Sequence, residues 1–367
     1  MAIQNGIITA ASHQWATRPS DQRFVSLTDL DAYVQNVRAH SRGKVVSSRA
    51  ITAAPVESDN KGLVAVGPNG SPVNVTHWSF GQLASRAGAP SGYLRDLPAP
   101  LAADCINYGL QHARSIEDLG VLLYQNGGMG ELRAVTGPNY GRIWNATITR
   151  SLVQRFGDGL TGTWKVPGEF GKRVAITKAN TTLYASDRDM FVFLADEDHR
   201  ITVPNRRNGE SGTLARGFFV WNSEVGAATF GIATFLFDYV CMNRIIWGAT
   251  EYAEVRIRHT SGAPDRWIEE VSPAITAYAN ASTHRIDAAI KAARLARIED
   301  IDEFLSKRFT RAQVSSIKAA HMADEQRPIE TLWDAATGIT AYARGIEYQD
   351  QRVQLEREAG KVLDLAA

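Results

Sequence analysis

The segment from residue 215 to residue 248, ARGFFVWNSEVGAATFGIATFLFDYVCMNRIIWG, constrains the fold more than any other part of the chain. It is apolar enough to form core strands, but six polar residues interrupt it: Arg216, Asn222, Ser223, Glu224, Asn243 and Arg244. Buried polar groups cost free energy unless hydrogen-bond partners satisfy them. The segment therefore predicts a ligand, a strained turn or a structural hydrogen-bond network among core strands.

The rest of the 367-residue chain predicts an α+β fold with more than one unit. β-branched runs broken by turn residues indicate strands before residue 262, and helical spacing of apolar residues follows Pro264. We expect a central, mostly antiparallel β-sheet with a mixed helical region before it and a helical region after it. The expected units are 1–120, with a small three-helix unit, then a β-rich 121–262 and a helical 263–367.

Local signals place several elements within these units. Asn126-Gly127-Gly128 predicts a hairpin between strands at 121–124 and 131–136. Capping boxes are expected at Ser79 with Gln82 and at Thr310 with Gln313. Asn145 is expected to cap a helix at 146–156, and residues 196–199 to form an exposed hairpin tip between two strands. A further strand is expected at 173–178, and Pro328 in the first turn of a helix.

Charge and cysteine content narrow the class of protein. The net charge of +1 argues against a surface that binds polyanions everywhere, although it permits a local basic groove. Cys105 and Cys241 lie far apart in apolar contexts, which is typical of buried reduced thiols in a cytosolic protein. The sequence shows no signal peptide and no apolar run long enough to cross a membrane. We therefore expect a cytoplasmic protein.

Catalytic and cofactor motifs are missing from the sequence. Gly127-Gly128-Met129-Gly130 lacks the lysine of a phosphate loop, and Ser223 in N-S-E-V-G lacks the first glycine of a nucleophile elbow. The eight histidines are scattered singly. We predict no cofactor, no metal site and no catalytic residue. The remaining enzymatic alternative is a polar pocket around Asn222, Ser223, Glu224 and Asn243.

Arginine and aromatic residues alternate through the β-rich region, which favours nucleic-acid binding. Guanidinium groups bind phosphates bidentately, and aromatic faces stack on bases, so both on one sheet would suit a single strand. Alternatively, Arg133 and Arg142 pair with Glu131 or Glu224, and the aromatic residues form core. The candidate nucleic-acid-binding residues are Arg133, Tyr140, Arg142, Arg188, Arg206, Arg207, Arg216 and Arg244.

Four segments of the chain resemble a known family. QLASRAGAPSGYLRDLP (82–98), RAVTGPNYGRIWN (133–145), RGFFVWNSEVGAATFG (216–231) and FDYVCMNRIIWG (237–248) resemble the phage- and plasmid-borne proteins grouped as domain of unknown function 932. The resemblance extends over roughly residues 75–345. It implies a mobile-element setting, with no agreed activity and no catalytic residues. At Asn139-Tyr140-Gly141-Arg142 the chain has one basic residue fewer than the family pattern.

Three hypotheses about function follow from the sequence. The first is a single-stranded-DNA-binding, annealing-like accessory of phage or plasmid recombination or replication that assembles as a homo-oligomer. The second is a protein-binding regulatory or anti-defence factor that acts through the C-terminal helices. The third is an enzyme that uses the polar pocket around Asn222 and Glu224. A helix-turn-helix at 79–98 is disfavoured, because Gly92 and Pro98 would disrupt its recognition helix.

Overall fold

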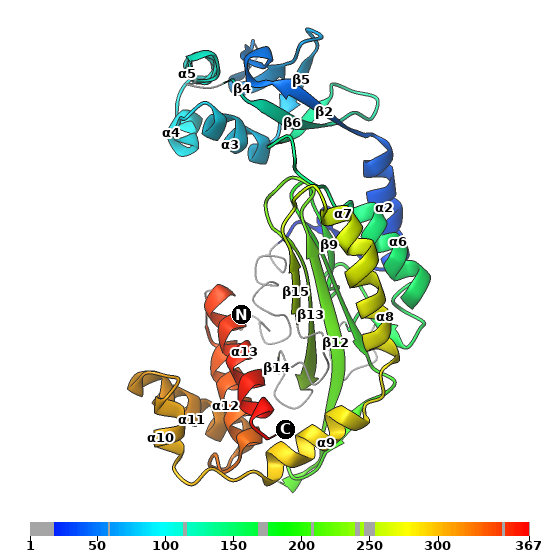
Figure 1. The fold of residues 1–367 in the computed structure, drawn as a ribbon, viewed down its shortest axis with the longest axis vertical. Coiled ribbons are helices and arrows are strands. Elements are labelled where there is room, and N and C mark those ends of the chain that lie inside the picture. Colours follow the sequence, from blue (N-terminus) through cyan, green and yellow to red (C-terminus); the bar gives the residue numbers. More distant parts are fainter. Residues whose placement is uncertain are drawn as a thin grey trace.

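The chain folds as an α+β protein with two β-sheets, as the sequence predicts. A computed structural model describes residues 18–57, 59–112, 116–167, 175–206, 209–238, 243–245, 254–346 and 349–366. Figure 1 shows three parts in series: a smaller sheet with its helices at the top, a larger sheet in the middle and a group of C-terminal helices at the lower left.

The larger sheet contains nine strands of the described residues, and every pairing in it is antiparallel. Its long strands are rich in Phe, Val and Ile, which suit a pleated surface buried on both faces. The main path runs β1 (Arg23–Phe24), β9 (Leu183–Ala185), β10 (Met190–Asp196), β12 (Gly212–Asn222), β13 (Phe230–Asp238) and β14 (Asn243–Ile245). Three further strands pair with β10, β12 and β13 respectively: β8 (Trp164–Lys165), β11 (Ile201–Val203) and β15 (Glu254–Ile257).

One face of the larger sheet packs against helices. Met190, Val192 and Leu194 alternate along β10 and contribute to this core, whereas Phe191 and Phe193 lie on the opposite face. Figure 1 shows the covering helices on one side of β12 and β13. They are α2 (Leu27–Ala39), which follows the short turn η1 (Ser20–Gln22), α6 (Asn145–Phe156), α7 (Ala263–Arg266), the π-helical η4 (Trp267–Val271) and α8 (Ser272–Asn280).

The smaller sheet has six strands, and its only parallel pair among the described residues is β5 with β7. Its order is β2 (Ser41–Ser47), β6 (Asp118–Tyr124), β7 (Glu131–Thr136), β5 (Pro72–Val75), β4 (Asp59–Val66) and β3 (Thr52–Val56). The predicted hairpin at Asn126-Gly127-Gly128 joins β6 to β7 and is confirmed. β6 pairs with β2, and β7 pairs with β5, so strands from both sides of residue 120 belong to the same sheet. The boundary between units that the sequence predicts at residue 120 therefore falls inside this sheet.

Three helices cover one face of the smaller sheet. Leu83, Ile106 and Leu110 are buried there against Leu119 and Val121 of β6. These helices are α3 (His77–Arg86), α4 (Ser91–Asp96) and α5 (Ala99–His112), and the short turn η2 (Ser48–Ala50) joins β2 to β3.

The C-terminal helices form a third core together with parts of the larger sheet. Trp333 and Ile317 are fully buried in it, next to Leu214 of β12 and Leu236 of β13. These helices are α9 (His284–Leu295), α10 (Ile301–Ser306), α11 (Arg311–Glu325), α12 (Leu332–Arg344) and α13 (Gln349–Asp364).

No helix among the described residues combines the length and the apolar character that crossing a membrane requires.

Candidate anion-binding site

Three of the six polar residues that interrupt the apolar segment, Asn222, Ser223 and Glu224, lie at the turn between β12 and β13. Asn222 donates from its side-chain amide to the carbonyl of Ile143 (2.8 Å) and to the side chain of Asn145 (2.7 Å). Glu224 accepts from the backbone N–H of Asn145 (2.9 Å) and pairs with Arg133 (3.1 Å). Asn222, Glu224 and Arg133 are at most 5% exposed, so these groups form a buried hydrogen-bond network.

Ser223 connects this turn to two other segments of the chain. Its hydroxyl donates to the carbonyl of Arg188 (2.6 Å) and accepts from the N–H of Ala227 (2.9 Å). Its own carbonyl accepts from the Tyr140 hydroxyl (2.8 Å). The turn thereby fixes the backbone of Arg188 and the ring of Tyr140.

The same turn also contacts the smaller sheet through Val225. The carbonyl of Val225 accepts from the indole N–H of Trp78 (2.9 Å) and from the side-chain amide of Gln82 (2.8 Å), both on α3. Gln82 in turn accepts from the N–H of Val135 on β7 (2.8 Å). Gly226 follows with φ = +84°, a conformation that favours glycine because it has no Cβ.

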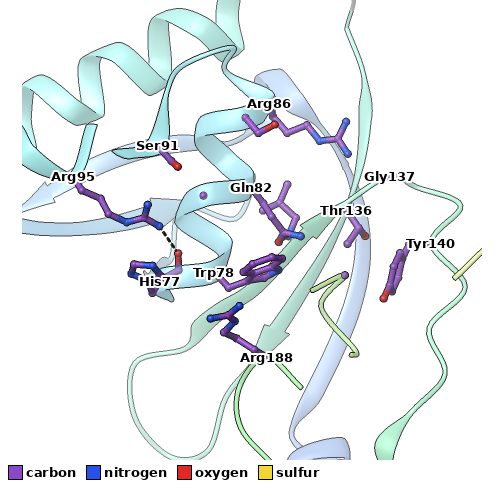
Figure 2. Close-up of a pocket in the computed structure, with 14 residues that line it drawn as sticks. His77, Trp78, Gln82, Arg86, Ser91, Arg95, Thr136, Gly137, Tyr140 and Arg188 are labelled. Carbon is purple, nitrogen blue, oxygen red and sulfur yellow. Dashed lines mark hydrogen bonds between the residues drawn. The ribbon is translucent and has the colours of Figure 1, made fainter. Parts of the chain in front are cut away.

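A cavity of about 760 Å³ lies where these segments meet. Its walls come from α3, α4, the end of β7, the following loop, and the β9–β10 and β12–β13 turns. Figure 2 shows Arg188 beside Trp78, with Gln82 and Tyr140 on neighbouring walls and Arg95 next to His77. Among the described residues that line the cavity there is no Asp or Glu, so the cavity is basic.

Three guanidinium groups define the chemistry of this pocket. Arg188 lies over the Trp78 ring, 4.8 Å from its centre, has no ion pair among the described residues, and its buried Nε has no hydrogen-bond partner there. Arg95 donates to the carbonyl of His77 (2.9 Å) and has no ion pair with a carboxylate in the described part of the chain. The Arg86–Glu117 pair (3.2 Å) is exposed and therefore weak. Such groups favour a ligand with negatively charged oxygens.

The Tyr140 ring at the edge of the pocket packs against His259 and Arg142. Tyr140 stacks on His259, with ring centres 4.8 Å apart, and Arg142 lies over the Tyr140 ring at 5.3 Å. Burial raises the pKa of Tyr140 and lowers the pKa of His259, so both rings are neutral near pH 7. Burial also lowers the pKa of Arg142, whose Nε donates to the carbonyl of Glu224 (2.7 Å).

The pocket contains only some of the residues that the sequence predicts to bind nucleic acid. Arg188 and Tyr140 line it, and Arg142 lies directly behind Tyr140. Arg133 is buried against Glu224 and does not reach the cavity.

Two further predicted arginines lie in separate buried ion pairs. Arg206 pairs with Glu325 of α11. Arg216 pairs with Asp196 (2.9 Å) and donates to backbone carbonyls at the end of α8, among them that of Tyr278. The structure therefore does not bring the predicted arginines to one face of the sheet.

Three predicted residues fall wholly or partly outside the described part of the chain. Arg207 lies outside the described residues. Asn243 and Arg244 contribute backbone to β14, and their side chains lie outside what the structure describes.

The residues predicted to bind nucleic acid do not include the pocket residues on α3 and α4, which are His77, Trp78, Gln82, Arg86 and Arg95. A signal was present, because no Asp or Glu occurs between Asp59 and Asp96. Among the described residues, no group of three or more His, Cys, Asp or Glu side chains could hold a metal ion.

Comparison with protein-family models, curated proteins and solved structures finds no match to this chain. The resemblance to the domain of unknown function 932 stays a prediction from the sequence.

Proposed function

We propose that the chain binds single-stranded nucleic acid, and that phosphates of the strand occupy the basic pocket between α3, α4 and the β12–β13 turn. The observation that carries this proposal is the Arg188 guanidinium, which lies over Trp78 in a cavity whose described lining residues include no carboxylate. A guanidinium held in this way can bind a phosphate with its N–H groups and stack a base on its open side.

The shape of the site favours a single strand over a duplex. The pocket is concave, and its cationic groups come from three segments of chain that surround it. A flexible single strand can direct one or two phosphates into such a cavity, whereas the phosphates of a duplex lie on a stiff convex surface. A role as an accessory of phage or plasmid recombination or replication is part of the proposal and rests on the sequence resemblance.

The test is fluorescence anisotropy with a labelled single-stranded oligonucleotide at several salt concentrations. We expect Arg188→Ala and Arg95→Ala each to weaken binding about tenfold, because each removes a charge-assisted hydrogen bond to a phosphate. Each should also reduce the slope of log affinity against log salt by about 0.7. Arg311→Ala is the matched control, because Arg311 is an exposed arginine at the start of α11, outside the pocket.

Two results would overturn the proposal. One is the absence of binding by the unaltered chain at low salt. The other is binding by Arg188→Ala and Arg95→Ala with the same affinity and salt slope as Arg311→Ala. A duplex competitor that displaces the labelled strand as well as an unlabelled single strand would reject the preference for single strands.

A further inference from the structure

A second cavity, of about 530 Å³, lies on the smaller sheet and has a different chemistry. It opens on the same sheet face that α3–α5 cover elsewhere, because Val121 and Leu132 contribute both to the core under those helices and to the cavity wall. Val46, Val73 and Leu123, which are only partly buried, line it as well. The floor of this cavity is therefore aliphatic.

Strand pairing places two cations beside this aliphatic floor. In the antiparallel pair of β2 and β6, Arg42 lies opposite Leu123 and Lys44 lies opposite Val121. Residues directly opposite each other in a sheet point to the same face. Arg42 and Lys44 therefore belong to the apolar face of the sheet, at its β2 edge, and both line the cavity.

The cationic rim lacks a carboxylate partner. No Asp or Glu occurs among the described residues that line the cavity, and Lys44 has no ion pair within the described part of the chain. The Arg42 guanidinium donates from Nη1 to the carbonyls of Ala39 (2.7 Å) and Ser41 (2.9 Å), which hold it at this end of the strand. His40 lines the same rim, with its Nδ1 2.8 Å from the carbonyl of Asn36.

We infer that this cavity binds a small amphipathic carboxylate, such as a medium-chain fatty acid. Its alkyl chain would cover the aliphatic floor and remove that surface from water, and its carboxylate would pair with Lys44 and Arg42 at the rim. The volume lies within the range of small-molecule sites. This inference is independent of the proposed nucleic-acid function, because the two cavities share no lining residue.

The test is isothermal titration calorimetry of the full chain with decanoate, below the concentration at which decanoate forms micelles. We expect one decanoate per chain, and at least tenfold weaker binding of decanol, which has the same chain length without the charge. The double variant Lys44→Gln/Arg42→Gln should also lose about tenfold in decanoate affinity. Arg49→Gln, an exposed arginine of the same unit outside the cavity, should bind decanoate normally.

A second variant tests the apolar floor without removing charge. Val73→Phe would fill part of the cavity and should reduce decanoate binding, with circular dichroism checking that the variant is folded. Equal binding of decanoate and decanol, or unchanged binding by the double variant, would overturn the assignment. So would no binding at all, in which case Lys44 only protects the edge strand against pairing with another sheet.

Oligonucleotide competition separates this site from the basic pocket. A saturating single-stranded oligonucleotide should leave decanoate affinity unchanged. Displacement of decanoate by the oligonucleotide would contradict a separate carboxylate site and leave the nucleic-acid proposal standing.

Discussion

At the scale of single residues, the buried polar groups of the β12–β13 turn are explained by the backbone groups that they satisfy. The Asn222 side chain donates to the carbonyl of Ile143, and Glu224 accepts from the N–H of Asn145. Both backbone groups lie where the chain enters α6. The sequence predicted the need for such a network. It could not identify the partners, because they lie 79 positions away along the chain.

Replacement of Asn222 by Leu tests this role. The substitution leaves the Ile143 carbonyl and the Asn145 side chain without their buried donor, so we expect a loss of about 1–3 kcal/mol in the free energy of unfolding. Thermal unfolding would show it as a lower Tm. Ala228→Ser, at an exposed position of the same turn, is the control and should leave the Tm unchanged. If Asn222→Leu keeps its Tm but loses oligonucleotide binding, the Asn222 amide contributes to ligand binding and not to stability.

At the scale of elements, the local sequence signals gave mixed results. The capping box of Thr310 and Gln313 is confirmed at the start of α11. The capping box at Ser79 is wrong, because Thr76 caps α3 and accepts from the N–H of Ser79. Asp196 is not part of a solvated hairpin tip, because it is buried against Arg216 from the neighbouring strand β12.

Three other local predictions also failed. Asn145 is the first residue of α6 and not its cap, because its side chain accepts from Asn222. Pro328 does not begin α12, whose cap is Thr331. The described part of the strand expected at 173–178 is irregular. At α6 and α12 a side-chain hydrogen bond accompanies the observed helix start: Asn222 donates to Asn145, and Thr331 accepts from the N–H of Asp334.

The packing of α11 on α12 predicts a pH-dependent stability. His321 is 1% exposed, its Nδ1 contacts the Thr337 hydroxyl (3.3 Å), and burial lowers its pKa below the ordinary 6.5. The unfolded chain then binds a proton more readily than the folded chain, so the free energy of unfolding falls as the pH drops below about 6.5. Nearby Glu325 and Asp334 oppose this shift, whereas Arg327 and Arg206 strengthen it.

Urea unfolding between pH 7.5 and pH 5 measures this dependence. We expect stability to fall toward pH 5 in the unaltered chain, and His321→Gln to show a smaller fall. The pKa of the partly buried His259 is also lowered, so this residue also reduces the free energy of unfolding as the pH falls. The dependence of stability on pH should therefore become weaker in His321→Gln without disappearing. Identical slopes in the two proteins would show that His321 does not titrate on unfolding.

At the scale of the whole molecule, the β12–β13 turn joins the smaller sheet to the larger one. The Arg133–Glu224 pair links β7 to this turn, and Trp78 and Gln82 on α3 bind the same turn. The α+β class and the C-terminal helices could be predicted from the sequence. The Arg133–Glu224 pair is one of the alternatives that the sequence leaves open, and the structure selects it over a pair with Glu131. The Arg206–Glu325 pair could not be predicted, since the two residues lie 119 positions apart.

Glu224→Gln should weaken this junction. It leaves the Arg133 charge buried without its carboxylate, and we expect a loss of about 3–5 kcal/mol in the free energy of unfolding. Hydrogen exchange should show the largest loss of protection in β7 and in the first turn of α6. Glu224 pairs with Arg133 of β7 and accepts from the N–H of Asn145 at the start of α6. The matched control is Glu330→Gln, which also removes one negative charge. The exposed ion pair of Glu330 with Arg297 should contribute almost nothing to stability. Equal stability of the two variants would contradict a structural role for the pair.

The Val225 carbonyl has a consequence for how this chain can vary. The atom that anchors Trp78 and Gln82 belongs to the main chain, so it is present whichever amino acid occupies position 225. The Val225 side chain itself is fully enclosed by apolar neighbours. Exchange of Val225 for the smaller Ala should therefore keep this carbonyl on the wall of the basic pocket, whereas a larger side chain would have to displace its neighbours. Loss of the glycine that follows would reshape the turn and release both α3 side chains together.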